Sequence, residues 1–261
     1  MDGLLPDGVA VVDAYDSAFD RDRLADPPPG HRAAAFAAEL RALGNAGPGR
    51  RTEFSRARIC AHAAVVALGR SPEPIRMGEH REPRWPDGLV GSLTHCAGYR
   101  AAAVADTGTV LAIGVDAEPD LPLPEAVSAL AFTAADRYCS GDLARFRHWD
   151  RLAFSARESV FKAWFTVTGR WLGFADATVS LVPDGPGGGR FAATIASAVP
   201  GIEDLLLACG TAVVGGRYRW AAGPTPLVVT AVTLRHRSAG PPAPAVQGGG
   251  GEPSSPRVDH R

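Results

Sequence analysis

The segment from Phe154 to Phe165 constrains the fold more than any other part of this sequence. It contains neither Pro nor Gly, and Phe154, Phe161 and Phe165 recur at helical spacing, so we expect an amphipathic helix. Glu158 and Lys162 are four residues apart and therefore share one face of that helix. The sequence thus predicts a helix that carries a charged pair among its apolar positions.

Lys162 is also the only lysine in the chain; the rest of its 27 basic residues are arginines. This bias suggests that a compact ammonium does something here that a guanidinium would not. Two structural interpretations compete with a functional one: Ser155 and Glu158 fit a capping box, and Glu158 and Lys162 fit a surface ion pair. The apolar period continues upstream through Trp149 and Leu152, so we do not expect the helix to begin at Ser155.

Composition indicates an ordinary globular protein. The chain has 261 residues, 46% of them apolar, and a net charge of -1, which allows one large domain or two small ones and gives no global signal for nucleic acid binding. No apolar run is long enough to cross a bilayer, and the N-terminus lacks the features of a signal peptide. The four cysteines are widely scattered, so we expect reduced thiols and a cytoplasmic location without membrane attachment: Cys60, Cys96, Cys139 and Cys209.

The N-terminal part predicts a strand at residues 9–12 and helices at 33–43 and 52–68, the second ending at Gly69. Clustered arginines near the start of the second helix form either a solvated basic face or a phosphate site, because guanidinium groups bind phosphate through forked hydrogen bonds. These are Arg50, Arg51, Arg56 and Arg58. The proline-rich connection at residues 71–88 is long enough to suggest a functional loop.

Two acidic residues close a predicted hairpin of strands at residues 99–105 and 110–118. Side chains alternate along a strand, so Asp116 and Glu118 project to the same face, and Pro119 ends the ladder. Adjacent carboxylates repel each other unless a cation neutralises them, and hard oxygen ligands suit Mg²⁺. Two exposed acids at a strand edge remain the alternative interpretation. His95, after Gly91 and Ser92, could face a ligand or be a satisfied local histidine.

The C-terminal part predicts a helical and loop-like region at residues 120–150, with a helix start near Thr133, before the helix at 154–165. Strands are then expected at 177–182, 190–195, 211–214, 218–221 and 227–234. The last residues are rich in Pro and Gly and are expected to be disordered. We therefore predict an α+β protein with two halves of similar size, residues 1–117 and 118–237, followed by a tail at 238–261.

Three ordered motifs resemble the larger, pseudo-dimeric class of 4′-phosphopantetheinyl transferases. Gly114-Val115-Asp116-Ala117-Glu118 resembles the first family motif, Gly-(Ile/Val)-Asp-x-Glu. The segment 154–162 resembles the second, (Phe/Trp)-Ser-x-Lys-Glu-(Ala/Ser)-x-x-Lys, with Arg157 where the family usually has Lys. Residues 85–96 and the arginine-rich helix resemble the enterobactin-synthetase-component subgroup. The resemblance implies a fold of two α+β halves related by a pseudo-twofold axis.

The resemblance also implies a reaction: transfer of the 4′-phosphopantetheine arm of coenzyme A to a serine of apo acyl, peptidyl or aryl carrier proteins, with release of 3′,5′-adenosine bisphosphate. Coenzyme A would lie between the halves, with Mg²⁺ held by Asp116, Glu118 and Glu158 and by the carbonyl of Ala117. Glu158 would act as general base, and Lys162 would neutralise charge on the pyrophosphate. Further implied coenzyme A contacts are Arg50 (or Arg51), Arg58, Arg76, Met77, Gly78, Glu79, His80, Thr94, His95 and Arg157.

Two other activities fit the same residues. A Mg²⁺-dependent phosphohydrolase would use these acids with water as nucleophile, and a non-catalytic module would bind coenzyme A without turnover. We expect a monomer, since both halves belong to one chain, with no nucleic acid or membrane partner.

Overall fold

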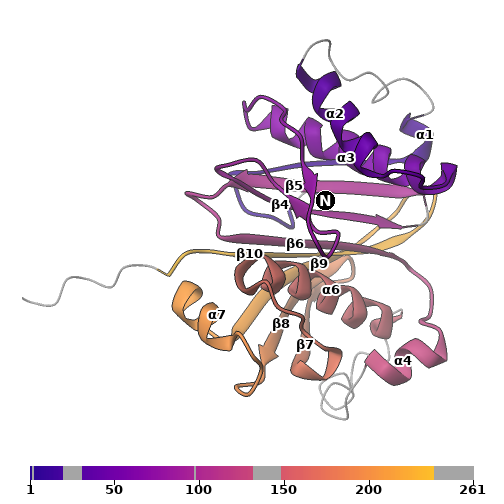
Figure 1. The fold of residues 1–261 in the computed structure, drawn as a ribbon. Coiled ribbons are helices and arrows are strands. Elements are labelled where there is room, and N and C mark those ends of the chain that lie inside the picture. The colour runs from indigo at the N-terminus through magenta and orange to yellow at the C-terminus, as the bar shows by residue number, and fades with distance from the viewer. Residues whose placement is uncertain (2, 20–30, 97, 132–147, 238–261) are drawn as a thin grey trace, which may run out of the picture.

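The computed structural model describes the chain except for residues 2, 20–30, 97, 132–147 and 238–261. In this described part, two antiparallel sheets lie against each other and helices cover their outer faces (Figure 1). The fold is therefore of the mixed α+β class, as the sequence predicts. A short hairpin, β2 (Arg76–Met77) with β3 (Pro83–Arg84), extends from the N-terminal part.

The smaller sheet has the order β1 (Val9–Tyr15), β5 (Tyr99–Asp106), β4 (Leu89–Cys96). Helices α2 (His31–Ala42) and α3 (Pro48–Ala67) lie on its outer side, and the short α1 (Asp16–Phe19) follows β1 (Figure 1). Alternate residues of β5 face opposite ways: Ala102 and Val104 pack with α3, whereas Ala101, Ala103 and Ala105 pack with the larger sheet. Small side chains let β5 fit between two layers.

The larger sheet has the order β6 (Ala112–Pro119), β10 (Leu227–Leu234), β9 (Val213–Ala221), β8 (Gly188–Ile195), β7 (Ala177–Gly185). One face meets the smaller sheet, and the other packs on α6 (Trp149–Thr168), whose Trp164 is fully buried. The remaining described elements of this part are α4 (Glu125–Ala131), the 3₁₀ helix η2 (Phe174–Asp176) and α7 (Ile202–Cys209).

Both long helices have recognisable ends. α3 begins at Pro48, earlier than predicted, because proline lacks an amide hydrogen and suits the first turn of a helix. The predicted end of α3 is confirmed, since Gly69 follows with a positive φ of 74°. α6 ends at Gly169, also with positive φ, and Ser155 lies inside it, so the capping-box interpretation is wrong.

Other expectations differ in detail. The predicted strands at 211–214 and 218–221 form one strand, β9, and α7 was not predicted. The helix start near Thr133 and the tail at 238–261 lie outside the described residues. The proposed boundary after residue 117 falls within β6, and the division into two halves stays a prediction. Within the described residues, each helix is too short or too polar to span a membrane.

Candidate active site

The two sheets meet where β4 runs beside β6, the edge strand of the larger sheet. Hydroxyl groups of β4 replace the missing backbone partner: Ser92 Oγ accepts a hydrogen bond from the Val115 amide (3.1 Å), and Thr94 Oγ1 accepts one from the Ala117 amide (3.0 Å). These amides would otherwise be buried without acceptors, which is costly. The side chains thus join the sheets on both sides of Asp116.

Asp116 is the centre of a hydrogen-bonded cluster and is only 5% exposed. Its Oδ1 accepts hydrogen bonds from Lys162 Nζ (2.8 Å) and Thr94 Oγ1 (3.3 Å), and its Oδ2 accepts one from Ser155 Oγ (2.8 Å). Lys162 Nζ also donates to the Val115 carbonyl at 2.9 Å. Lys162 therefore pairs with Asp116 across the two elements, and the interpretation of a surface ion pair with Glu158 is wrong.

Close contact between α6 and β6 makes this cluster possible. A Cβ atom at Gly114 would collide with the backbone carbonyl of Ser159, so only glycine lets the helix lie this near the strand. Buried hydroxyls fill the contact: Thr230 of β10 donates to the Ser155 carbonyl at 2.9 Å and hydrogen-bonds to Ser159 Oγ. Lys162, one turn beyond Glu158, is thereby brought over the end of β6.

Glu118 and Glu158 lie near Asp116 and are half-buried. Burial, and then the negative charge of Asp116, raises the pKa of each carboxyl above its ordinary value. Arg151 Nη1 donates to Glu118 Oε2 at 2.8 Å and opposes this shift, whereas Lys162 opposes that of Glu158. The interpretation of two exposed acids is wrong, because Asp116 is buried.

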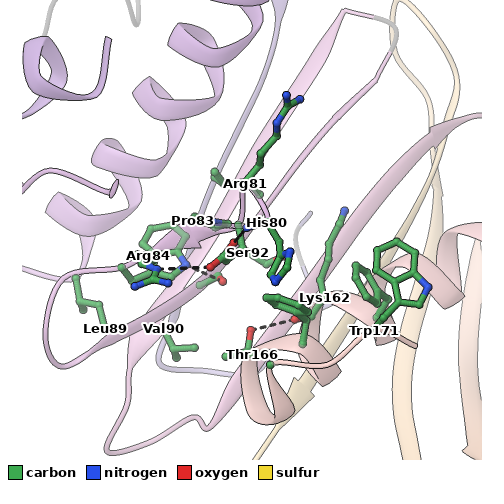
Figure 2. Close-up of a pocket in the computed structure, with 17 residues that line it drawn as sticks. His80, Arg81, Pro83, Arg84, Leu89, Val90, Ser92, Lys162, Thr166 and Trp171 are labelled. Atoms are coloured by element: carbon green, nitrogen blue, oxygen red, sulfur yellow. Dashed lines mark hydrogen bonds and ion pairs between the residues drawn. The ribbon is translucent and has the colours of Figure 1, made fainter. Parts of the chain in front are cut away.

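A cavity of about 700 Å³ opens beside this cluster and is lined by both parts of the chain (Figure 2). The hairpin β2–β3 and strand β4 form one wall, and α6 forms the other, with Lys162 among the residues that line the space. The His80 ring contacts Phe165 edge-on, with 5.7 Å between centroids, and so joins the hairpin to the helix. The cavity lies within the size range of small-molecule sites.

Comparison with known proteins identifies the family. The model of the 4′-phosphopantetheinyl transferase N-terminal domain matches residues 38–105, and that of the 4′-phosphopantetheinyl transferase superfamily matches residues 112–209. The chain is 44% identical to the 4′-phosphopantetheinyl transferase Svp of Streptomyces mobaraensis over 208 residues, which is 76% of this chain and 78% of Svp. It belongs to the 4′-phosphopantetheinyl transferase family.

Two further relatives support the assignment. The 4′-phosphopantetheinyl transferase PptT of Mycobacterium tuberculosis is 42% identical over 71% of this chain and 79% of its own length. Enterobactin synthase component D of Salmonella typhimurium is 35% identical over 46% of this chain and 51% of its own length. The chain is therefore a phosphopantetheinyl transferase, an enzyme that moves the phosphopantetheine arm of coenzyme A to a carrier protein.

The transferase brings together most of the site residues that the sequence suggested. Asp116, Lys162 and Thr94 are directly bonded, and Glu118 and Glu158 flank them. His95 follows Thr94 on β4. Partial desolvation of its ring, and then the positive charge of the nearby Arg100, lower the pKa of His95. The segment from Arg76 to His80 belongs to the β2–β3 hairpin, of which His80 lines the cavity.

The predicted phosphate-binding arginines divide into two groups. Arg50 and Arg51 are near the start of α3, where Arg50 pairs with Glu53 (3.7 Å) and Arg51 donates to the Gly44 carbonyl (3.0 Å). Arg58, only 3% exposed, instead points into the protein. Its Nε lies 3.8 Å from Glu39 Oε2 and its guanidinium lies over the Phe54 ring. Arg58 thus does not share one exposed basic face with the others.

Arg157 also points away from the Asp116 cluster. It is 4% exposed and donates hydrogen bonds from Nε to the Phe174 carbonyl (3.3 Å) and from Nη2 to the Ala177 carbonyl (3.1 Å). Arg157 therefore connects α6 to the segment around η2 through these two hydrogen bonds.

Sequence reasoning gave no site role to Ser92, Ser155 or Thr230, although each has a defined place in the joint between the sheets. One signal was available for the first: Ser92 and Thr94 alternate along a strand and so share a face. Thr230 gave no comparable signal, because its partners are distant in sequence.

Proposed function

We propose that this transferase moves the phosphopantetheine arm to serine residues of apo acyl, peptidyl or aryl carrier proteins, with coenzyme A held between the two proposed halves of the chain, in the cavity that the β2–β3 hairpin, β4 and α6 line. The observation that carries the proposal is the Lys162–Asp116 pair at the joint, beside a cavity lined by both parts of the chain. One chain supplies both sides of this site, so we also propose that the active form is a monomer.

The carboxylates fit a Mg²⁺ ion in their chemistry. Asp116, Glu118 and Glu158 supply hard oxygen donors. Burial, and then the negative charge of Asp116, raises the pKa of the other two carboxyls, so a bound cation would favour their ionised forms. Among the described residues, however, no group of three or more His, Cys, Asp or Glu side chains forms a ready metal site. We propose that these three carboxylates and the Ala117 carbonyl hold Mg²⁺ together with substrate, where the ion would neutralise pyrophosphate charge.

Glu158 is the proposed general base. Its raised pKa makes it a better proton acceptor than an ordinary glutamate once it is ionised. The carrier serine oxygen would form a bond to the β-phosphorus of coenzyme A, its proton would pass to Glu158, and the bond between the β-phosphorus and the bridging oxygen would break to release 3′,5′-adenosine bisphosphate. Lys162 would stabilise charge that develops on the phosphate oxygens, since an ammonium in a partly buried site interacts strongly with such charge.

The other contacts with coenzyme A are assigned to residues of α3, of β4 and of the segment that contains β2. Arg50 would bind the 3′-phosphate at the start of α3, while Thr94 and His95 would contact the pyrophosphate from β4. The segment 76–80 would border the adenine. Arg58 and Arg157 are also proposed contacts of coenzyme A, and each side chain would have to leave its present partners to reach it. Arg58 would move away from Glu39, and Arg157 from two backbone carbonyls.

Intact mass spectrometry of an apo carrier protein tests this function. Incubation with the enzyme, coenzyme A and Mg²⁺ should add one phosphopantetheine arm, and EDTA should prevent the gain. Glu158→Gln is the matched control, since it keeps the shape of the side chain and removes its basicity. Release of adenosine bisphosphate without any carrier protein would instead indicate a phosphohydrolase, and coenzyme A binding without turnover would indicate a binding module.

A further inference from the structure

A second cavity, of about 520 Å³, lies on the reverse side of the larger sheet from α6. Arg190 of β8, Arg217 of β9 and Ala231 of β10 are neighbours in one row across the strands and all line it. Ala231 packs with the apolar cluster between the two sheets, so this row faces away from α6. The segment 3–6 forms the opposite wall.

The cavity has an excess of positive charge. Arg190 lies directly opposite Arg217 in the strand register, an arrangement that is unfavourable for two like charges. Arg235 lines the same space. Across the described residues, the only carboxylate in ion-pair range of these three arginines is Asp184, 3.6 Å from Arg217 Nη2. A bound anion would therefore reduce the repulsion among these arginines, which Asp184 offsets only in part.

A glycine contributes to the hollow on this side of the sheet. Gly215 lies two residues before Arg217 on β9, so it shares the face of Arg217 and leaves that position without a side chain at the cavity. A Cβ atom at Gly215 would meet no atom within 4 Å, so the space above this position is open. Leu4 and Leu5 add apolar surface on the facing segment. The cavity therefore combines arginines with an apolar wall.

We propose that this cavity binds a small organic phosphate, with the guanidinium groups of Arg190, Arg217 and Arg235 on the phosphate and the organic part against the apolar wall. Guanidinium groups match phosphate oxygens through forked hydrogen bonds, and the volume suits a small molecule. The site is separate from the transfer site, because Asp116 faces α6 across the sheet whereas Arg217 faces the other way. Its occupation does not depend on the proposed transferase chemistry.

Isothermal titration with phenyl phosphate tests the proposal, using full-length enzyme saturated with coenzyme A so that the transfer site is filled. We expect one saturable site that binds phenyl phosphate more tightly than inorganic phosphate and does not bind phenol. The variant Arg190→Gln/Arg217→Gln should weaken binding by about tenfold or more, because two charge-assisted contacts are lost. Its transfer activity and melting temperature should stay at the wild-type values.

A control variant separates a specific site from a general charge effect. Arg70→Gln/Arg170→Gln removes the same number of positive charges at exposed positions outside the cavity and should leave phenyl phosphate binding unchanged. Equal weakening in both double variants, wild-type affinity in Arg190→Gln/Arg217→Gln, or the absence of saturable binding would each overturn the proposal. If the double variant fails to fold, Arg190→Gln alone gives the measurement, since this exposed side chain has no ion pair or hydrogen bond among the described residues.

Discussion

Helices α3 and α6 both lie across an antiparallel sheet, yet their buried polar side chains meet different surroundings (Figure 1). On α3, Arg58 and His62 meet Glu39 of α2, away from the joint between the sheets. On α6, Ser155 and Lys162 meet Asp116 at that joint. Similar packing thus places one polar cluster between α2 and α3 and the other beside the cavity.

The α3 cluster has the properties of a structural clamp. Glu39 Oε1 is 3.0 Å from His62 Nε2 and accepts a hydrogen bond from the Ile75 amide at 2.6 Å, so it connects both helices to the connection that leads into β2. All its charged members are buried, and burial lowers the pKa of Arg58. A buried charge needs its partner, which makes such a cluster sensitive to the loss of one member.

The largest expected effect concerns the α6 cluster. Glu158→Gln should lower the transfer rate by about 10²–10⁴-fold, the usual contribution of a general base. The melting temperature should change little, because Glu158 makes no hydrogen bond among the described residues. Carrier modification followed by mass spectrometry, with thermal denaturation of the same sample, checks both parts. Near-normal turnover would remove Glu158 from the proposed mechanism.

The α6 cluster could be anticipated from sequence because its signals are local. Alternation along the strand places Asp116 and Glu118 on one face, and helical spacing places Glu158 and Lys162 on another. The α3 clamp could not be anticipated, since Glu39 precedes Ile75 by 36 residues and no periodicity links them. The direction of the Arg157 side chain could not be predicted from the sequence either, because it donates to backbone carbonyls, which every residue type supplies.

Breaking the α3 clamp should affect stability more than chemistry. Glu39→Ala should lower the free energy of unfolding by about 3–5 kcal/mol, because Arg58 loses its buried counter-charge and the Ile75 amide loses a buried acceptor. Urea denaturation measures this change, and kcat at low temperature should stay within a few-fold of wild type. A loss of kcat as large as that of Glu158→Gln, without a loss of stability, would show that the two clusters do not differ as argued.

The close approach of α6 to β6 gives a third contrast. Gly114→Ala should lower the free energy of unfolding by about 2–3 kcal/mol, because the methyl group forces α6 away from the strand. It should also lower kcat, since Lys162 would move from Asp116. The matched control is Gly49→Ala on α3, where the added Cβ has no atom within 4 Å and should be neutral or stabilising. Both variants are checked by urea denaturation and by the rate of carrier modification. Only Gly114→Ala should lower the free energy of unfolding and kcat.

The smallest effect is expected at Arg157, where the family usually has Lys. Arg157→Lys should lower the free energy of unfolding by about 1–2 kcal/mol, because one ammonium cannot replace both the Nε and Nη2 donors to the Phe174 and Ala177 carbonyls. For a domain of this size that corresponds to a fall in melting temperature of about 2–8 °C.

If Arg157 instead binds coenzyme A directly, the lysine variant would keep its melting temperature and change mainly the KM for coenzyme A. Arg157→Met distinguishes the two roles further. If Arg157 is structural, loss of its hydrogen bonds to the Phe174 and Ala177 carbonyls should lower stability again, while kcat stays near that of the lysine variant. If Arg157 binds a phosphate of coenzyme A, the KM for coenzyme A should rise well above that of the lysine variant.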